Sequence, residues 1–129
     1  MEIGEKYELD YSINEHVYNG FLNTFKDHNP LHTNEDFAKE KGFPKKVMHG
    51  NILNGCLSHF IGEELPTKDV IIHAQEINFL KPVYLNDTVT LKAVLKEKIE
   101  AVSAFVFKYT FVNQDGVKVA RGKIQIGII

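Results

Sequence analysis

The residues with the clearest potential for chemistry lie in the segment Asp-His-Asn-Pro-Leu-His, which runs from Asp27 to His32. A second polar pair, His49-Gly50, begins seventeen positions after His32 and opens an apolar stretch typical of a helix. A carboxylate can take a proton, an imidazole can exchange one near neutral pH, and free amides at a helix start can stabilise an oxyanion. This combination predicts an enzyme active site.

Composition limits the classes of protein that can carry such a site. The chain has 129 residues and 43% hydrophobic content, which predicts one domain spanning residues 1–129. Its 15 Lys and Arg against 17 Asp and Glu give a formal net charge of −2, so we expect no general attraction for nucleic acid or an anionic membrane. The single cysteine, the polar N-terminus and the lack of a long apolar run predict a cytoplasmic protein without disulfides.

Helical periodicity dominates the first half of the sequence. Ser12 and Glu15 form a capping-box pattern, and apolar residues at helical spacing then predict a helix over about 13–26. A second apolar stripe predicts a longer helix over about 50–63, which would begin at the His-Gly pair.

The polar segment falls between these helices. Pro30 keeps Asn29 out of helical geometry, which predicts a defined turn over residues 27–32. Thr33 followed by Asp36 suggests another cap, and it predicts a short helix that stops at Gly42. The candidate chemistry therefore lies in a stiff turn.

The second half of the sequence changes to a period of two. Alternation of apolar and polar residues predicts strands over about 69–80, around 89–95, around 105–111 and over about 117–128. The segment Asn-Gln-Asp-Gly at 113–116 is a hairpin turn signal between the last two strands. Helices first and strands after predict an α+β domain in which a long helix packs on an antiparallel sheet.

Three segments, in order, resemble the MaoC-like (R)-specific enoyl-CoA hydratases, and the similarity covers nearly the whole chain. Phe25–Ala38 resembles the family's hydratase signature, and Val47–Gly50 resembles the start of its central helix. Phe79–Tyr84, followed by Asp87-Thr88, resembles the strand segment that comes next. The resemblance implies a single hot-dog domain, in which an antiparallel sheet wraps around a long central helix.

The resemblance also implies a reaction. Family members use an Asp-His dyad to add water across the double bond of a trans-2-enoyl thioester, which gives an (R)-3-hydroxyacyl product. Asp27 and His32 match the dyad, and Gly50 matches the backbone amide that polarises the thioester carbonyl. An amide aimed at the thioester oxygen stabilises the transition state more than the substrate.

Supporting roles are expected for three more residues. Asn29 and His49 are assigned to the structure of their turns, because Asn is favoured there for reasons unrelated to catalysis. Ser58 lies eight residues after Gly50, on much the same face of the expected helix, and the family often has a small polar residue there that contacts the dyad.

The carrier of the acyl group stays open. Asn78 occupies a position where family members frequently have a basic residue, so contacts with a carrier's phosphates cannot be assigned. The same dyad working in reverse would dehydrate a 3-hydroxyacyl group on acyl carrier protein. A non-catalytic acyl-thioester binding module is a third possibility, although the dyad and Gly50 are all present. The resemblance also implies a homodimer, since the family's single-domain members pair through their sheets.

No metal or redox cofactor is expected. His28 and His32 have the i, i+4 spacing of a zinc helix, but Pro30 between them argues against a regular helix face. Cys56 falls within an apolar helix stripe and is assigned to the core. The aromatic series over 105–111 either lines an acyl tunnel or covers the central helix, and the second alternative is favoured.

Overall fold

A computed structural model describes every residue from Met1 to Ile129. None of its helices has both the length and the apolar character needed to cross a membrane. The elements in chain order are β1 (Lys6–Ser12), α1 (Glu15–Phe25), α2 (Pro30–Thr33), α3 (Glu35–Glu40), α4 (Ile52–His59), the π-helical turn η1 (Phe60–Glu64), β2 (Val70–Phe79), β3 (Thr88–Ile99), the 3-10 turn η2 (Glu100–Val102), β4 (Ala104–Val112) and β5 (Lys118–Ile128).

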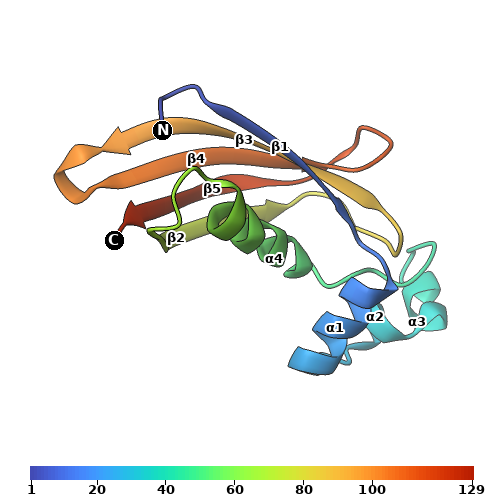
Figure 1. Ribbon diagram of the computed structural model, residues 1–129. Helices are drawn as coiled ribbons and strands as arrows, with labels where there is room; N and C mark the ends of the chain where they lie inside the picture. Colours follow the sequence, from blue (N-terminus) through green and yellow to red (C-terminus); the bar gives the residue numbers. More distant parts are fainter.

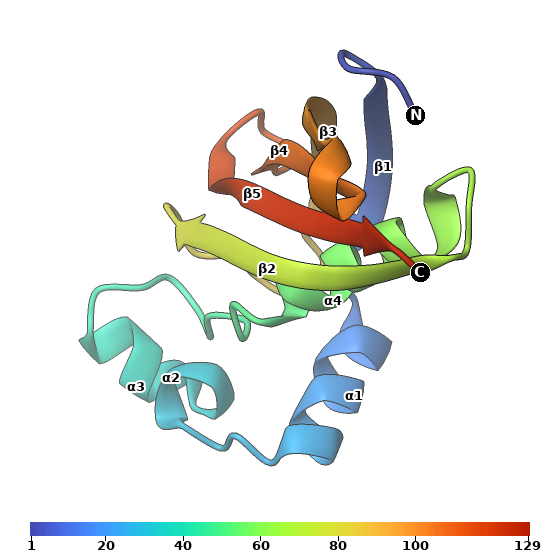
Figure 2. The same ribbon diagram turned by 90° about the vertical axis from the view of Figure 1, so that its left-hand side faces the viewer.

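The five strands form one antiparallel sheet in the order β1-β3-β4-β5-β2, so β1 and β2 are the edge strands. Figure 1 shows this sheet on one side of α4, with α1, α2 and α3 beyond one end. Figure 2 shows β1 and β2 as two sides of a corner that holds α4. The expected α+β domain, with a sheet wrapped around a central helix, is therefore confirmed.

The core lies between α4 and the inner face of the sheet, because α4 is apolar on that side. Leu53 and Leu57 of α4, and Phe60 just after it, are almost completely buried in this core, and Cys56 is buried with them. Burial raises the pKa of the Cys56 thiol to about 12, which fits its assignment as a small core residue. The sheet contributes alternate inward residues that include Leu91, Leu95, Phe107, Tyr109, Phe111, Ile124 and Ile126. The aromatic series thus covers the central helix.

Tyr109 also connects β4 to the edge strand β2. Its hydroxyl donates a 2.7 Å hydrogen bond to the carbonyl of Glu76. Gly122 on β5 lies beneath this bond, and a Cβ placed there would lie 1.9 Å from that carbonyl oxygen and 2.6 Å from the Tyr109 hydroxyl. Only glycine fits at this point of the sheet.

Some local expectations were wrong in detail. The cap of α1 is Asn14, whose side chain accepts from the Val17 amide, rather than Ser12. The cap of α3 is Asn34 rather than Thr33, whose hydroxyl instead lies within hydrogen-bond distance of the carbonyls of His28 and Asn29. Asparagine caps both helices, because its side-chain oxygen accepts a hydrogen bond from a free backbone amide in the first turn of each helix.

Two elements differ more substantially from the expected order. The strand β1 was not predicted, so helices do not simply precede strands. The central helix begins at Ile52 and ends as an α-helix at His59, and its last turn is π-helical through Glu64. This turn keeps both Phe60 and Ile61 buried.

Candidate active site

Asp27 is placed by the end of α1. Lys26 adopts a left-handed conformation, with φ 58°, and its amide bonds to the Leu22 carbonyl at 2.8 Å, which ends the helix and redirects the chain. One carboxylate oxygen of Asp27 then accepts from the Asn29 amide at 3.2 Å. The other oxygen remains free to face the site.

The short helix α2 places His32. The Asn29 side chain accepts from the Leu31 amide at 3.0 Å, and Pro30 occupies the first helical position, where its missing N–H costs nothing. The Tyr18 hydroxyl donates to the His32 carbonyl at 2.7 Å and fixes this turn against α1. The Asn29 side chain therefore caps the start of α2.

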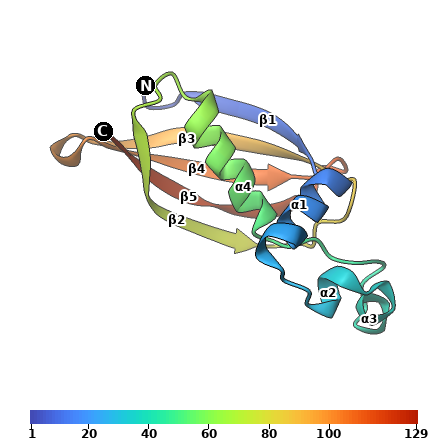
Figure 3. The same cartoon turned by 60° about the horizontal axis from the view of Figure 1, so that its bottom comes forward.

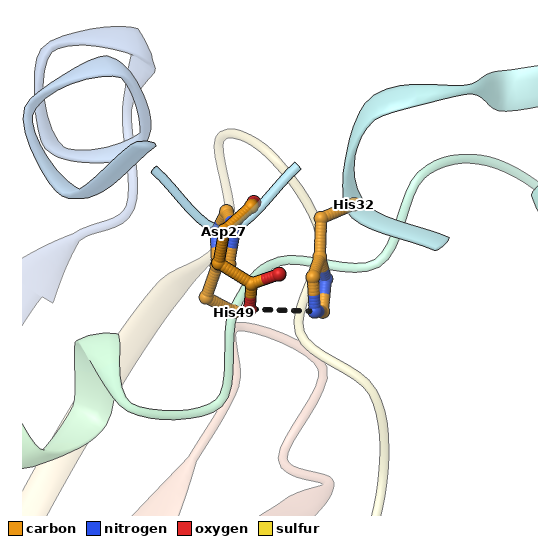
Figure 4. Close-up of side chains that lie close together, drawn as sticks. All are labelled: Asp27, His32 and His49. Carbon is orange, nitrogen blue, oxygen red and sulfur yellow. Dashed lines mark hydrogen bonds and ion pairs between the residues drawn. The ribbon is translucent and has the colours of Figure 1, made fainter. Parts of the chain in front are cut away.

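The hydrogen bonds of His32 determine which ring nitrogen faces the carboxylate. Its Nδ1 lies 2.7 Å from the Val47 carbonyl, and since a carbonyl only accepts, Nδ1 carries the hydrogen. In the neutral ring, Nε2 then has a free lone pair. It lies 3.9 Å from the free Asp27 oxygen, as Figure 4 shows. The His32 side chain is 17% exposed and that of Asp27 is 51% exposed, so solvent reaches the pair mainly at the Asp27 carboxylate.

His49 holds the dyad segment from the opposite direction. Its Nε2 donates to the Asp27 carbonyl at 2.9 Å, and its ring stacks on His32 with centroids 4.1 Å apart. His49 is 3% exposed, and its Nδ1 has no hydrogen-bond partner. Together with the bond from His32 to Val47, this makes a reciprocal clamp, defined here as the two side-chain bonds by which the 27–32 and 47–49 segments hold each other's carbonyls.

Gly50 follows this clamp directly and precedes α4. Its N–H makes no hydrogen bond within the chain. A Cβ at this position would lie 3.0 Å from the Phe79 ring, so a side chain would crowd that ring. A free amide just before a helix start, without a side chain to shield it, fits the expected position of an oxyanion donor.

Two cavities meet at these residues. The dyad cavity, of about 480 Å³, is lined by Asp27, His32, His49 and Gly50 together with Phe79 and Lys81. The apolar cavity, of about 1120 Å³, lies between α1, β1 and α4. Phe21, Asp27 and Asn51 line both, so the two cavities adjoin at these residues. Figure 3 shows α1 beside the start of α4.

Ser58 is not brought to the dyad within one chain. It is exposed and lines neither cavity, whereas Gly55 lines the apolar cavity. Eight residues turn an α-helix about 80° past two full turns, and Gly50 precedes α4, so the two positions do not share a face. The contact of His49 with the Asp27 carbonyl was not predicted, because local spacing gives no signal for it.

Three side chains at the site could also serve as metal ligands. Asp27, His32 and His49 each have a ligand atom within 4.8 Å of the others. However, the His49 Nε2 is already bonded to a carbonyl, and the two imidazoles stack with planes 33° apart. The Asp27 oxygen and the His32 Nε2 are the two polar atoms that face each other at the site. His28, the other candidate ligand, is exposed.

Comparison with known proteins agrees with this geometry. A sheet curved around one central helix is the hot-dog fold, and the solved (R)-hydratase from Aeromonas caviae superimposes with a TM-score of 0.91 at 26% identity, covering 100% of this chain and 98% of that one. The MaoC-like domain family model matches residues 1–111. The chain therefore belongs to the MaoC-like family of hydratases and dehydratases.

Two curated relatives carry the same name. The (R)-specific enoyl-CoA hydratase of Aeromonas caviae is 32% identical over 90 residues, which cover 70% of this chain and 67% of that protein. The (R)-specific enoyl-CoA hydratase of Rhodospirillum rubrum is 30% identical over 107 residues, which cover 83% and 74%.

Proposed function

We propose that this protein catalyses the reversible, (R)-specific hydration of trans-2-enoyl-CoA to (R)-3-hydroxyacyl-CoA. The observation that carries the proposal is the gap of 3.9 Å between the Asp27 carboxylate and the His32 Nε2. Both atoms can accept a hydrogen bond, since Nδ1 holds the ring hydrogen. A water placed between them can donate one hydrogen to each and present its oxygen to the substrate.

In the forward reaction the dyad takes a proton from this water while the water oxygen bonds to the β-carbon. Electrons of the double bond move to the α-carbon and the thioester oxygen. The dyad then returns a proton to the α-carbon on the same face, so that no net proton is gained or lost. Positioned acid–base groups of this kind contribute about 10²- to 10⁴-fold in rate.

The Gly50 amide is assigned to the thioester oxygen. It is free of other hydrogen bonds and borders the same cavity as the dyad. Negative charge on that oxygen grows in the transition state, so an amide fixed beside the start of α4 stabilises the transition state selectively. The acyl chain is assigned to the apolar cavity, which begins at Asp27.

The test is turnover of crotonyl-CoA followed by loss of the enoyl-thioester absorbance, with chiral analysis of the 3-hydroxybutyryl product. We expect activity and the (R) product without added metal or redox cofactor. An (S) product would contradict the assigned face. Absence of turnover with crotonyl-CoA and with longer enoyl-CoA thioesters would favour a binding module instead.

We also propose that two copies of the chain pair through β2. Only one side of β2 is bonded within the chain, to β5. Exposed apolar side chains lie along this edge and at the adjoining C-terminus, including Ile71 at 50%, Ile72 at 38% and Ile129 at 76%. An unpaired apolar edge favours pairing with a second strand.

Light scattering during size exclusion checks this pairing. We expect twice the chain mass of 14.7 kDa, and a shift to the single-chain mass when Ile71 and Ile72 are both replaced by Lys. Val117→Lys, an exposed apolar position in the β4–β5 hairpin, is the matched control that should leave the mass unchanged. A wild-type protein of single-chain mass would refute the homodimer.

A further inference from the structure

The apolar cavity, of about 1120 Å³, runs along one face of α4. Its lining positions there are 51, 52, 55, 56 and 59, which is the spacing of a single helical face. Asn51 also lines the dyad cavity, whereas His59 is the last residue of α4. At about 1.5 Å per residue, the apolar cavity therefore extends about 12 Å along the helix from its boundary with the dyad cavity.

The wall of this cavity is apolar along the helices and becomes polar at His59. Val17, Phe21 and Phe25 of α1 line it, and the Phe25 side chain is 68% exposed, which leaves a large apolar surface open to a ligand. The Tyr11 hydroxyl lies 2.9 Å from the His59 Nδ1, so the polar atoms of these two lining residues are paired with each other. An alkyl chain gains burial along the helix, and it gains nothing by extending past this polar pair.

Two glycines in helix interiors leave room in the cavity. Gly20 lies in the middle of α1 and Gly55 in the middle of α4, and both line the cavity. Neither has a positive φ, and a Cβ at either position would meet no neighbouring group within 4 Å. Backbone geometry and packing therefore do not require glycine here, although glycine is less stable than alanine inside a helix. The missing side chains provide open space for a ligand.

The cavity lies on the β1 side of α4. Residues 10–12 of β1 line it, and no residue of β2 does. The two strands are the opposite edges of the sheet and lie on different sides of α4 (Figure 2). The pairing proposed above through β2 therefore uses the other edge of the sheet.

Resting on the proposed function, we propose that this cavity makes the protein selective for enoyl-CoA substrates with medium-length acyl chains of about ten carbons. An extended chain advances about 1.2 Å per bond, so about ten bonds span the distance from the dyad cavity to the Tyr11–His59 pair. Each methylene buried on the way contributes about fourfold in binding. Gly20 and Gly55 are the specificity-determining residues, because a side chain at either position would occupy the space of the acyl chain.

The experiment compares acyl chains of different length on one carrier. Values of kcat/KM are measured with crotonyl-, octenoyl-, decenoyl- and tetradecenoyl-CoA, and Kd for the saturated butyryl-CoA and decanoyl-CoA is measured by calorimetry. For the wild type we expect kcat/KM to rise from crotonyl-CoA to decenoyl-CoA and to rise no further with tetradecenoyl-CoA. Decanoyl-CoA should bind more tightly than butyryl-CoA.

The variants Gly20→Leu and Gly55→Leu, made separately, test the two determinants. In each we expect the ratio of kcat/KM for decenoyl-CoA to that for crotonyl-CoA to fall about tenfold, as for the loss of nearly two buried methylenes. The preference for decanoyl-CoA over butyryl-CoA should fall by the same factor. The temperature of thermal unfolding should rise in both variants, because leucine is a better helix former than glycine, and this readout separates a filled cavity from a damaged fold. Gly62→Leu is the matched control, since Gly62 is exposed just after α4 and lines neither cavity; both ratios should stay at the wild-type values.

The contrary outcomes are distinct. A wild type whose kcat/KM falls from crotonyl-CoA to octenoyl-CoA would overturn the proposal, and so would unchanged ratios in both glycine variants. A further rise with tetradecenoyl-CoA would overturn the limit assigned to the Tyr11–His59 pair. If no enoyl-CoA is turned over, the proposed function fails, while the saturated thioesters, which have no double bond to hydrate, still decide whether the cavity binds the acyl chain.

Discussion

Replacing Asp27 with Asn is expected to lower kcat for crotonyl-CoA hydration by about 10³-fold, within the range that positioned acid–base groups contribute. Asn keeps the shape of the side chain and an oxygen for the Asn29 amide, so the turn should stay intact. It cannot take a proton from the water held against His32. Thermal unfolding of the variant should match that of the wild type, and steady-state kinetics would measure the loss.

The matched control is Asp36→Asn, which removes an exposed carboxylate from the first turn of α3. It should keep kcat near the wild-type value. His32→Ala is expected to lose a similar factor to Asp27→Asn, and the double variant should lose little more, because the two groups act on one water. Near-normal kcat in both single variants would refute the dyad.

Gly122→Ala should cost about 3 kcal/mol in the free energy of unfolding, at the upper end of typical overpacking. The added methyl group would overlap the Glu76 carbonyl oxygen and the Tyr109 hydroxyl. Relieving that overlap requires β2 to move away from β5 and the hydrogen bond between Tyr109 and Glu76 to break. Urea unfolding followed by circular dichroism would measure the change.

Gly127→Ala on the same strand is the control. The three atoms nearest to a Cβ there all belong to the imidazole of His73, which is an exposed side chain that can rotate away. We therefore expect a loss well below that of Gly122→Ala. Equal losses at both positions would mean that the general cost of replacing glycine in β5, and not the overlap with the Glu76 backbone, determines the effect.

Periodicity predicted most of the fold because the buried faces are regular. The strands β2, β3, β4 and β5 appear close to their expected bounds, and so do α1 and the start of α4. The strand β1 was missed although Tyr7, Leu9 and Tyr11 alternate with charged residues, since an edge strand buries its inward side chains only in part. The π-helical end of the central helix depends on packing against the sheet, which local sequence does not specify.

The candidate site could be predicted only in part from the sequence, because some of its contacts join residues far apart in the chain. Asp27, His32 and Gly50 were identified from short segments, and the structure brings them to one cavity. The contact between His49 and the Asp27 carbonyl joins residues 22 positions apart.

The reciprocal clamp has a consequence for motion at the site. Moving the 27–32 segment away from the 47–49 segment breaks both side-chain-to-carbonyl bonds at once, since each segment donates one and accepts one. Such a movement would carry Asp27 and His32 together away from Gly50, so the two bonds of the clamp hold the acid–base pair and the amide donor at one site.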